Sequence, residues 1–318
     1  MYTRSNPPTQ DEVLEFYTKL SNWGRWGADD ELGTLNLISP QVRRRAGAAV
    51  RHGISVSCSW DIPVGAGGVE RTMNVRKYKS EAVRNPSYPS SYYEDKHFGG
   101  SSEHLAFKTH EAWITHIDAL CHEFWDGKLY NDRPAEVVDA TQGAGFGAIS
   151  AAAAAMVTRG VLLDIAGLRG VDWLEVDDPV FPEDLEAAEE RQGVRVEAGD
   201  AILLRTGTDL RRRQTGRPHF DGSTGWHAAC LPWLSERDVA YIGCDTGTEI
   251  VPSGYPGIFA PVHTCGLVAM GLWLIDHCDL AACARTAEEL RQWDFLLSVA
   301  PIRFPGSSGS PVNPIATF

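Results

Sequence analysis

The spacing of apolar positions in the first part of the chain predicts two helices followed by a strand. Residues 10–20 have the spacing of an amphipathic helix. A second helix is expected from Pro40 to about Arg51, because Ser39 suits an N-cap and proline suits the first helical turn. Residues 54–60 then alternate between polar and apolar positions as a strand does.

Further along, apolar runs and helical patterns alternate. Residues 65–100 contain prolines with many serines and tyrosines, which predicts a long irregular loop, and residues 105–120 are expected to be extended. Apolar runs predict strands at 161–165, 201–205, 239–244 and 272–275. Helices are expected at 148–158, 182–191, 231–237 and 263–270. This order favours an α/β fold with a mixed sheet.

Composition is that of a soluble globular protein. The 318 residues are 43% hydrophobic and 22% charged, and they contain no internal repeat and no segment that resembles a linker. We therefore expect a single domain over residues 1–318, with residues 1–53 as a helical N-terminal arm. Trp23 and Trp26 in this arm could pack on the core of their own chain, or they could cover the pocket of a neighbouring subunit.

Charge and hydropathy exclude several classes of partner. The net charge of −13 disfavours nucleic-acid binding, and the only dense basic run is 211–213. No apolar stretch approaches the ~18 residues of a membrane span, and residues 1–15 have no signal-peptide pattern. The seven cysteines are odd in number and form no C-x-x-C motif. We expect a cytoplasmic protein that acts on a small molecule.

Candidate chemistry is concentrated between residues 110 and 122. If this segment is extended, His110, His116 and Asp118 point to one face, because side chains alternate with a period of two. His122 could reach back to Asp118 if the strand ends in a turn. Imidazole and carboxylate groups suit Zn²⁺, Mn²⁺ or Fe²⁺ better than Ca²⁺. The alternative is that these are ordinary polar residues on a solvated strand.

These residues lie in a motif that resembles a known family. The run THIDALCH at 115–122, followed by DGKLYN at 126–131, is similar to the signature of the metal-dependent cyclase family, which includes bacterial kynurenine formamidase and isatin hydrolase. The longer branch of that family is also resembled at 26–36, 159–164, 199–207 and 306–314. The resemblance covers nearly the whole chain. It implies a swivelling β/β/α fold, with a mixed sheet forming a barrel-like core, and a homodimer or higher homo-oligomer.

The resemblance also implies site residues. His116 and Asp118 match metal ligands, and His122 matches the general base beside them. His263 matches a ligand histidine near the C-terminus, and Asp276 stands where the family has an acidic or amide ligand, usually Glu.

The motif departs from the family pattern in four places. Ala112 replaces a ligand histidine, so that His110, two residues earlier, is a candidate replacement. Ile114 and Leu120 replace a glycine and a proline, and the spacing from His263 to the acidic position is one residue longer than expected. These departures leave open whether one metal ion or two are bound.

The activity implied is hydrolysis of a C–N bond in a formamide or cyclic amide, with Zn or Mn as the cofactor. A lactone hydrolase or a cyclase/dehydratase with the same metal is an alternative. A non-catalytic binding protein with a degenerate site is another.

Aromatic side chains flank the motif. Trp113, Phe124 and Trp125 could bind an aromatic substrate, or they could be core or wall residues. Pocket lining is expected from residues 65–100 and 253–259. A nucleophilic pair of Cys121 with the neighbouring His122 is disfavoured, because adjacent residues on a strand point apart.

Overall fold

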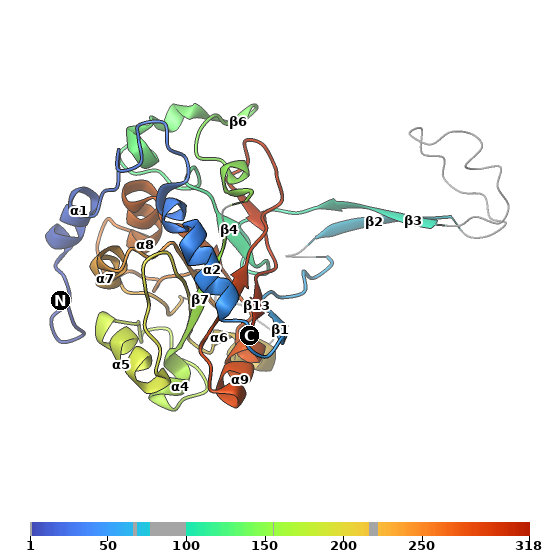
Figure 1. The fold of residues 1–318 in the computed structure, drawn as a ribbon. Helices are drawn as coiled ribbons and strands as arrows, with labels where there is room; N and C mark the ends of the chain where they lie inside the picture. Colours follow the sequence, from blue (N-terminus) through green and yellow to red (C-terminus); the bar gives the residue numbers. More distant parts are fainter. Residues whose placement is uncertain (1, 66–68, 77–99, 155, 216–221) are drawn as a thin grey trace.

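The computed structural model describes residues 2–65, 69–76, 100–154, 156–215 and 222–318. In this part of the chain, a nine-stranded sheet has the order β1-β13-β11-β7-β8-β9-β10-β4-β12 and curls into a half-barrel (Figure 1). Its strands are β1 (Ser55–Ser57), β4 (His116–Asp118), β7 (Val157–Asp164), β8 (Ala201–Arg205), β9 (Tyr241–Cys244), β10 (Trp273–Asp276), β11 (Asp294–Ser298), β12 (Gly309–Pro311) and β13 (Ile315–Thr317).

The middle of the sheet is parallel and its flanks are antiparallel. Strands β7, β8, β9 and β10 run in one direction, while β11 and β4 pair with the outer members of this group in the opposite direction. Every residue of β8 and β9 is buried, as expected for parallel strands covered on both faces. This confirms the predicted mixed α/β class, and it explains why these strands read as continuous apolar runs.

Helices cover the sheet. Helix α2 packs on β7 and β11, and α5 packs on β7. The helices are α1 (Gln10–Lys19), α2 (Pro40–Ala48), α4 (Ile165–Arg169), α5 (Pro182–Gln192), α6 (Thr208–Thr215), α7 (Cys230–Glu236), α8 (Pro261–Thr264) and α9 (Ala281–Leu290). Short 3₁₀ turns are η1 (Gly33–Leu37), η2 (Tyr130–Asp132), η3 (Ala135–Val137) and η4 (Ile149–Ala152), and η5 (Cys265–Met270) is a π-helical segment.

Local sequence determines where two helices begin or end. The Ser39 hydroxyl accepts from the backbone N–H of Val42 at the start of α2, as predicted. Helix α5 ends at Gly193, whose φ of +64° lies in the left-handed region that glycine adopts without strain. Helix α2 is shorter than predicted and ends at Ala48.

Two expectations were wrong. The described residues of 148–158 form the turn η4 and no α-helix, because β7 begins at Val157 and pairs there with β11. A run of alanines is a weak preference that such tertiary pairing overrides. Residues 105–120 are not continuously extended, since β3 (Gly100–Ala106) ends early and β4 is short.

The stretch 65–100 is not wholly irregular. Residues 70–76 form β2 (Glu70–Arg76), which pairs antiparallel with β3 along its full length. Residues 77–99 lie outside the described residues. The two strands form a ribbon that projects far from the sheet (Figure 1). A separate small pair joins β5 (Val138–Asp139) to β6 (Gly143–Ala144).

The N-terminal segment packs on its own chain. The Trp23 indole donates to the carbonyl of Val268 in η5 at 2.6 Å, and the Thr34 N–H donates to the carbonyl of Gly271 at 2.9 Å. Gly33 lies so close that a Cβ there would be 2.2 Å from the same Gly271 oxygen. Of the two alternatives for Trp23, packing on the own core is the one observed. No helix in the described ranges has the length and apolar character needed to cross a membrane.

Candidate metal centre

Strands β4 and β10 place three potential ligands on one face of the sheet. Their antiparallel register sets His116 directly opposite Asp276, and Asp118 opposite Leu274. Directly opposed residues, and residues two apart on one strand, point to the same face. One ligand atom from each of His116, Asp118 and Asp276 therefore lies within 4.8 Å of the others.

His263 reaches the same place from α8. Its Nε2 lies 3.4 Å from Oδ2 of Asp118 and 3.3 Å from Oδ2 of Asp276. The helix continues as the π-helical η5, a rare conformation that is found often at functional sites. A helix and two strands thus bring together four of the residues singled out from the sequence.

A second cluster shares Asp118. Nδ1 of His110 lies 2.8 Å from Oδ1 of Asp118, and Nε2 of His122 lies 4.0 Å from Oδ2. The His110 and His122 rings stack at 3.7 Å with an angle of 7° between their planes. Ligand atoms of these three residues also lie within 4.8 Å of one another. Asp118 therefore stands between two groups, each of which could hold an ion.

The local structure around His110 differs from the one expected. It lies in the loop before β4 and not on an extended strand shared with His116. Gly309 of β12 makes room for it, because a Cβ there would be 2.7 Å from Cε1 of the His110 ring. Nε2 of His110 is 3.0 Å from the Ser308 hydroxyl. The loop thus brings His110 to the site, although the chain has Ala112 where the family pattern has a ligand histidine.

Hydrogen bonds orient two imidazoles so that Nε2 of each faces Asp118. Nδ1 of His116 lies 2.8 Å from the carbonyl of Ile114, and Nδ1 of His263 lies 2.5 Å from Oε1 of Glu249. These acceptors favour a proton on Nδ1 of each ring, so that Nε2 is the nitrogen that faces Asp118. Metal-ligating histidines are usually oriented in this way by a carbonyl or a carboxylate behind them.

Thr248 and Glu249 were not singled out from the sequence. The Thr248 hydroxyl donates to Oδ1 of Asp276 at 2.5 Å, and Glu249 accepts from the backbone N–H groups of Val262 and His263. Thr248 is buried with φ of +57°, which is strained for a β-branched residue. His277, next to Asp276, has φ of +56°. The sequence contained one indication of the role of Thr248 and Glu249. Both residues follow the predicted strand at 239–244, and the carboxyl ends of neighbouring parallel strands lie at one edge of a sheet, where ligands bind.

Burial of negative charge dominates the electrostatics. Asp118, Asp276 and Glu249 are all buried. Burial alone would lower the pKa of the His263 imidazole, but the Asp276 charge and hydrogen bonds to carboxylates outweigh it and hold this pKa well above its usual range. Burial would likewise raise the pKa of Asp118, yet His110 and His263 hold it well below its usual range. Burial is outweighed at Asp276 as well, whose pKa is lowered chiefly by the His263 charge, so Asp118 and Asp276 remain ionised and need positive charge nearby.

The residues present fit a divalent cation. Oδ2 of Asp118 is buried and has no hydrogen-bond partner, although imidazole nitrogens surround it. A buried carboxylate oxygen left in this state is costly unless a cation completes its environment. Mixed imidazole and carboxylate donors suit Zn²⁺ or Mn²⁺.

Comparisons with known proteins agree with this geometry. A family model described as "Putative cyclase" matches residues 53–248, which include β4 and its motif. The chain belongs to the cyclase family. The crystal structure of a novel cyclase matches with 25% identity and a TM-score of 0.80, and the match covers 95% of this chain and 99% of that one. The resemblance seen in the sequence and the cyclase-like fold are both confirmed.

Isatin hydrolases share the cyclase fold at lower identity. Isatin hydrolase A from Labrenzia aggregata, bound to benzyl benzoate, is 19% identical with a TM-score of 0.54, covering 85% of this chain and 94% of that one. An isatin hydrolase bound to the product analogue thioisatinate is 18% identical with a TM-score of 0.55, covering 87% and 98%. No curated protein matches this cyclase sequence significantly.

The aromatic residues beside the cyclase motif lie in different settings. Trp125 stacks on Tyr17 of α1 at 4.2 Å and packs against the core. Trp113 is half-buried with the Arg212 guanidinium 4.8 Å from its ring centroid. Phe124 is 41% exposed. Only Phe124 leaves an open aromatic face close to His122 in the sequence.

Other expectations for the cyclase pocket have mixed outcomes. Residues 252–259 line a hollow of about 580 Å³, directly before the helix that carries His263. The part of 65–100 expected to line a pocket falls largely on 77–99, outside the described residues. Cys121 is buried, and burial raises the pKa of its thiol to about 12, which leaves it protonated and unsuited as a nucleophile.

Proposed function

We propose that this protein is a metal-dependent hydrolase that cleaves a C–N bond of a small formamide or cyclic amide. The observation that carries the proposal is the buried, unpartnered Oδ2 of Asp118 between His122 and His263. His116, Asp118, His263 and Asp276 would hold the cation, and His110 is the candidate for a second ion. When bound, such a cation lowers the pKa of a water ligand and polarises a carbonyl.

His122 is proposed as the general base. Burial lowers the pKa of its imidazole to about 4, with His110 and His263 adding to the effect and Asp118 opposing it. The ring is therefore neutral at pH 7 and has a lone pair available. His122 would accept a proton from the attacking water and return it to the leaving nitrogen, which must be protonated to depart. Stacking on His110 holds the ring in place for both transfers.

The proposed substrate is small and carries an aromatic ring. Phe124 and Phe259, which are 41% and 76% exposed, follow His122 and precede His263 closely in the sequence. Isatin hydrolases of the same fold support the choice of a C–N bond. A lactone ester would suit the same groups, and so would a cyclase/dehydratase substrate, so these remain the second candidates.

Elemental analysis with a substrate screen tests the proposal. Purified protein is expected to contain one or two Zn or Mn per chain, which His116→Ala should lose. Isatin, formanilide and an aromatic lactone are then compared by product release. His122→Ala should cut turnover about 10²–10⁴-fold while the metal stays bound. The exposed His52→Ala is the matched control. A metal-free wild type without affinity for Zn²⁺ or Mn²⁺ would overturn the proposal and favour a binding protein.

We further propose a single-domain homo-oligomer of the cytoplasm. Strand β1 pairs with β13, so residues 55–57 and 315–317 belong to one sheet. All residues of β3 are exposed in a two-stranded ribbon, which is marginal on its own and favours burial against another subunit. The seven cysteines are all free, as expected in a reducing compartment. Light scattering that gives only the 34.8 kDa monomer would contradict the oligomer.

A further inference from the structure

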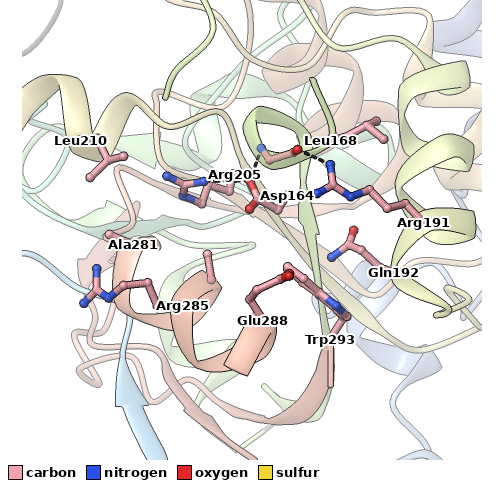
Figure 2. A pocket seen from close by; sticks show the side chains of 12 residues that line it. Asp164, Leu168, Arg191, Gln192, Arg205, Leu210, Ala281, Arg285, Glu288 and Trp293 are labelled. Atoms are coloured by element: carbon pink, nitrogen blue, oxygen red, sulfur yellow. Dashed lines mark hydrogen bonds and ion pairs between the residues drawn. The ribbon is translucent and has the colours of Figure 1, made fainter. Parts of the chain in front are cut away.

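A second pocket lies on the same edge of the sheet, away from the metal centre. It has a volume of about 340 Å³ and lies between α5, α9 and the carboxyl ends of β7 and β8 (Figure 2). The last residues of these two strands, Asp164 and Arg205, form its inner wall as a salt bridge of 2.8 Å. The strand ends that border the pocket, those of β7 and β8, lie three and two strand spacings from β10, which is about 14 and 10 Å.

The rim of this pocket is positively charged. Arg191 and Arg285 stand on opposite sides of it (Figure 2). Asp164 is already paired with Arg205, so Glu288 is the remaining carboxylate in the lining. Arg285 is exposed, and it forms no ion pair with another described residue. A local excess of guanidinium groups on a chain of net charge −13 favours an anionic ligand.

The inner surface of the pocket adds two further features. Trp293 and several small or aliphatic side chains make most of the lining apolar. Gln192 donates from Nε2 to the carbonyl of Leu162 at 2.9 Å, but its Oε1 is buried without a hydrogen-bond partner. An unsatisfied buried acceptor is costly, and a ligand with an O–H or N–H group would satisfy it.

We propose that this pocket is a second binding site, for a small carboxylate that carries an apolar ring and an O–H or N–H donor on the far side of the ring from the carboxylate. The carboxylate binds the guanidinium of Arg285, the ring packs on Trp293, and the donor binds Oε1 of Gln192. A volume near 340 Å³ is at the small end of ligand pockets and suits a one-ring molecule. The site requires no metal and is separate from the proposed hydrolase centre.

Calorimetric titration with 4-hydroxybenzoate tests this proposal. Binding is expected for the metal-loaded wild type, and Arg285→Ala should weaken it about tenfold or more. Gln192→Leu should weaken 4-hydroxybenzoate but not benzoate, which lacks the donor. Arg44→Ala, an exposed arginine on α2, is the matched control and should bind as the wild type does. Arg285 is exposed, so its replacement leaves the fold intact.

The same titration on His116→Ala separates this site from the metal centre. Unchanged binding in His116→Ala together with a loss in Arg285→Ala supports the second site. Loss in His116→Ala with normal binding in Arg285→Ala would place the carboxylate on the metal and overturn the proposal. Absence of binding to the wild type at millimolar concentration would also overturn it. Because the readout is binding, these outcomes do not depend on any hydrolase activity.

Discussion

Two aspartates of equal burial have opposite surroundings. Asp118 and Asp200 are both 0% exposed. Asp200 receives the Arg45 guanidinium on Oδ1 at 2.6 Å and the Arg159 guanidinium on Oδ2 at 2.7 Å, and it accepts from the backbone N–H of Glu197. Asp118 has imidazoles around it and one oxygen with no hydrogen bond.

The difference separates a structural charge from a functional one. A buried carboxylate with both oxygens paired to guanidinium groups is complete within the fold, and its removal leaves a buried cation uncompensated. A buried carboxylate with one oxygen that accepts no hydrogen bond is tolerated where a ligand contacts that oxygen. Burial of a carboxylate alone therefore does not indicate a binding site, whereas a buried carboxylate oxygen without a hydrogen bond does.

The largest expected effect is the loss of activity in Asp118→Asn. Metal content should fall toward zero, and turnover should fall on the order of 10³-fold or more, since a catalytic cation contributes several kcal/mol to the transition state. The stability of the metal-free protein should fall much less than in Asp200→Asn, because the imidazoles beside Asp118 can lose a proton, whereas the guanidinium groups beside Asp200 cannot. Metal analysis, turnover and urea unfolding measure the three quantities. A loss of metal-free stability as large as that of Asp200→Asn would mean that Asp118 has the structural role of Asp200.

Asp200→Asn should show the reverse pattern. Removing this carboxylate leaves the buried Arg159 with the Asp294 carboxylate at 3.0 Å and the Arg195 carbonyl at 3.1 Å, and the expected loss is about 3–5 kcal/mol of unfolding free energy. Metal content should remain that of the wild type. Urea unfolding measures the loss, with the exposed Asp29→Asn as the control that should change nothing measurable. Normal stability in Asp200→Asn would remove the contrast between the two aspartates.

Removal of the metal should destabilise the wild type but not Asp118→Asn. A ligand present at 100 times its dissociation constant stabilises the folded state by about 2.7 kcal/mol. A chelator should therefore lower the melting temperature of the wild type, and added Zn²⁺ or Mn²⁺ should restore it. Scanning calorimetry with and without the chelator provides the test. An equal shift in Asp118→Asn would show that the cation binds elsewhere.

The smallest expected effect belongs to Glu249→Gln. Glu249 contacts His263 and not the cation itself, and loss of such a supporting carboxylate weakens metal binding about 10–100-fold. The amide oxygen can still accept from one of the two backbone N–H groups, those of Val262 and His263, so stability should fall only modestly. Competition with a fluorescent chelator measures the affinity. An unchanged affinity would show that Glu249 supports only the fold of α8.

Local sequence was sufficient for much of the sheet and for one half of the site. The strands near β7 and β8 are apolar throughout because both their faces are covered, so composition alone predicts them. Ser39 and Gly193 mark helix ends through chemistry that is confined to a few neighbouring residues. His116 and Asp118 lie two apart on one strand, and the period of two places them on one face wherever the strand packs.

Tertiary structure alone decided the rest. His110 reaches Asp118 through a loop that Gly309 of β12 admits, and these residues are far apart in the sequence. Glu249 meets His263 within the long connection from β9 to β10, whose path the local pattern does not determine. The alanine run that suggested a helix became part of a turn once β7 extended to Val157. Local pattern predicts where a strand or a helix can form, but contacts between distant segments exist only after the sheet order and register are set.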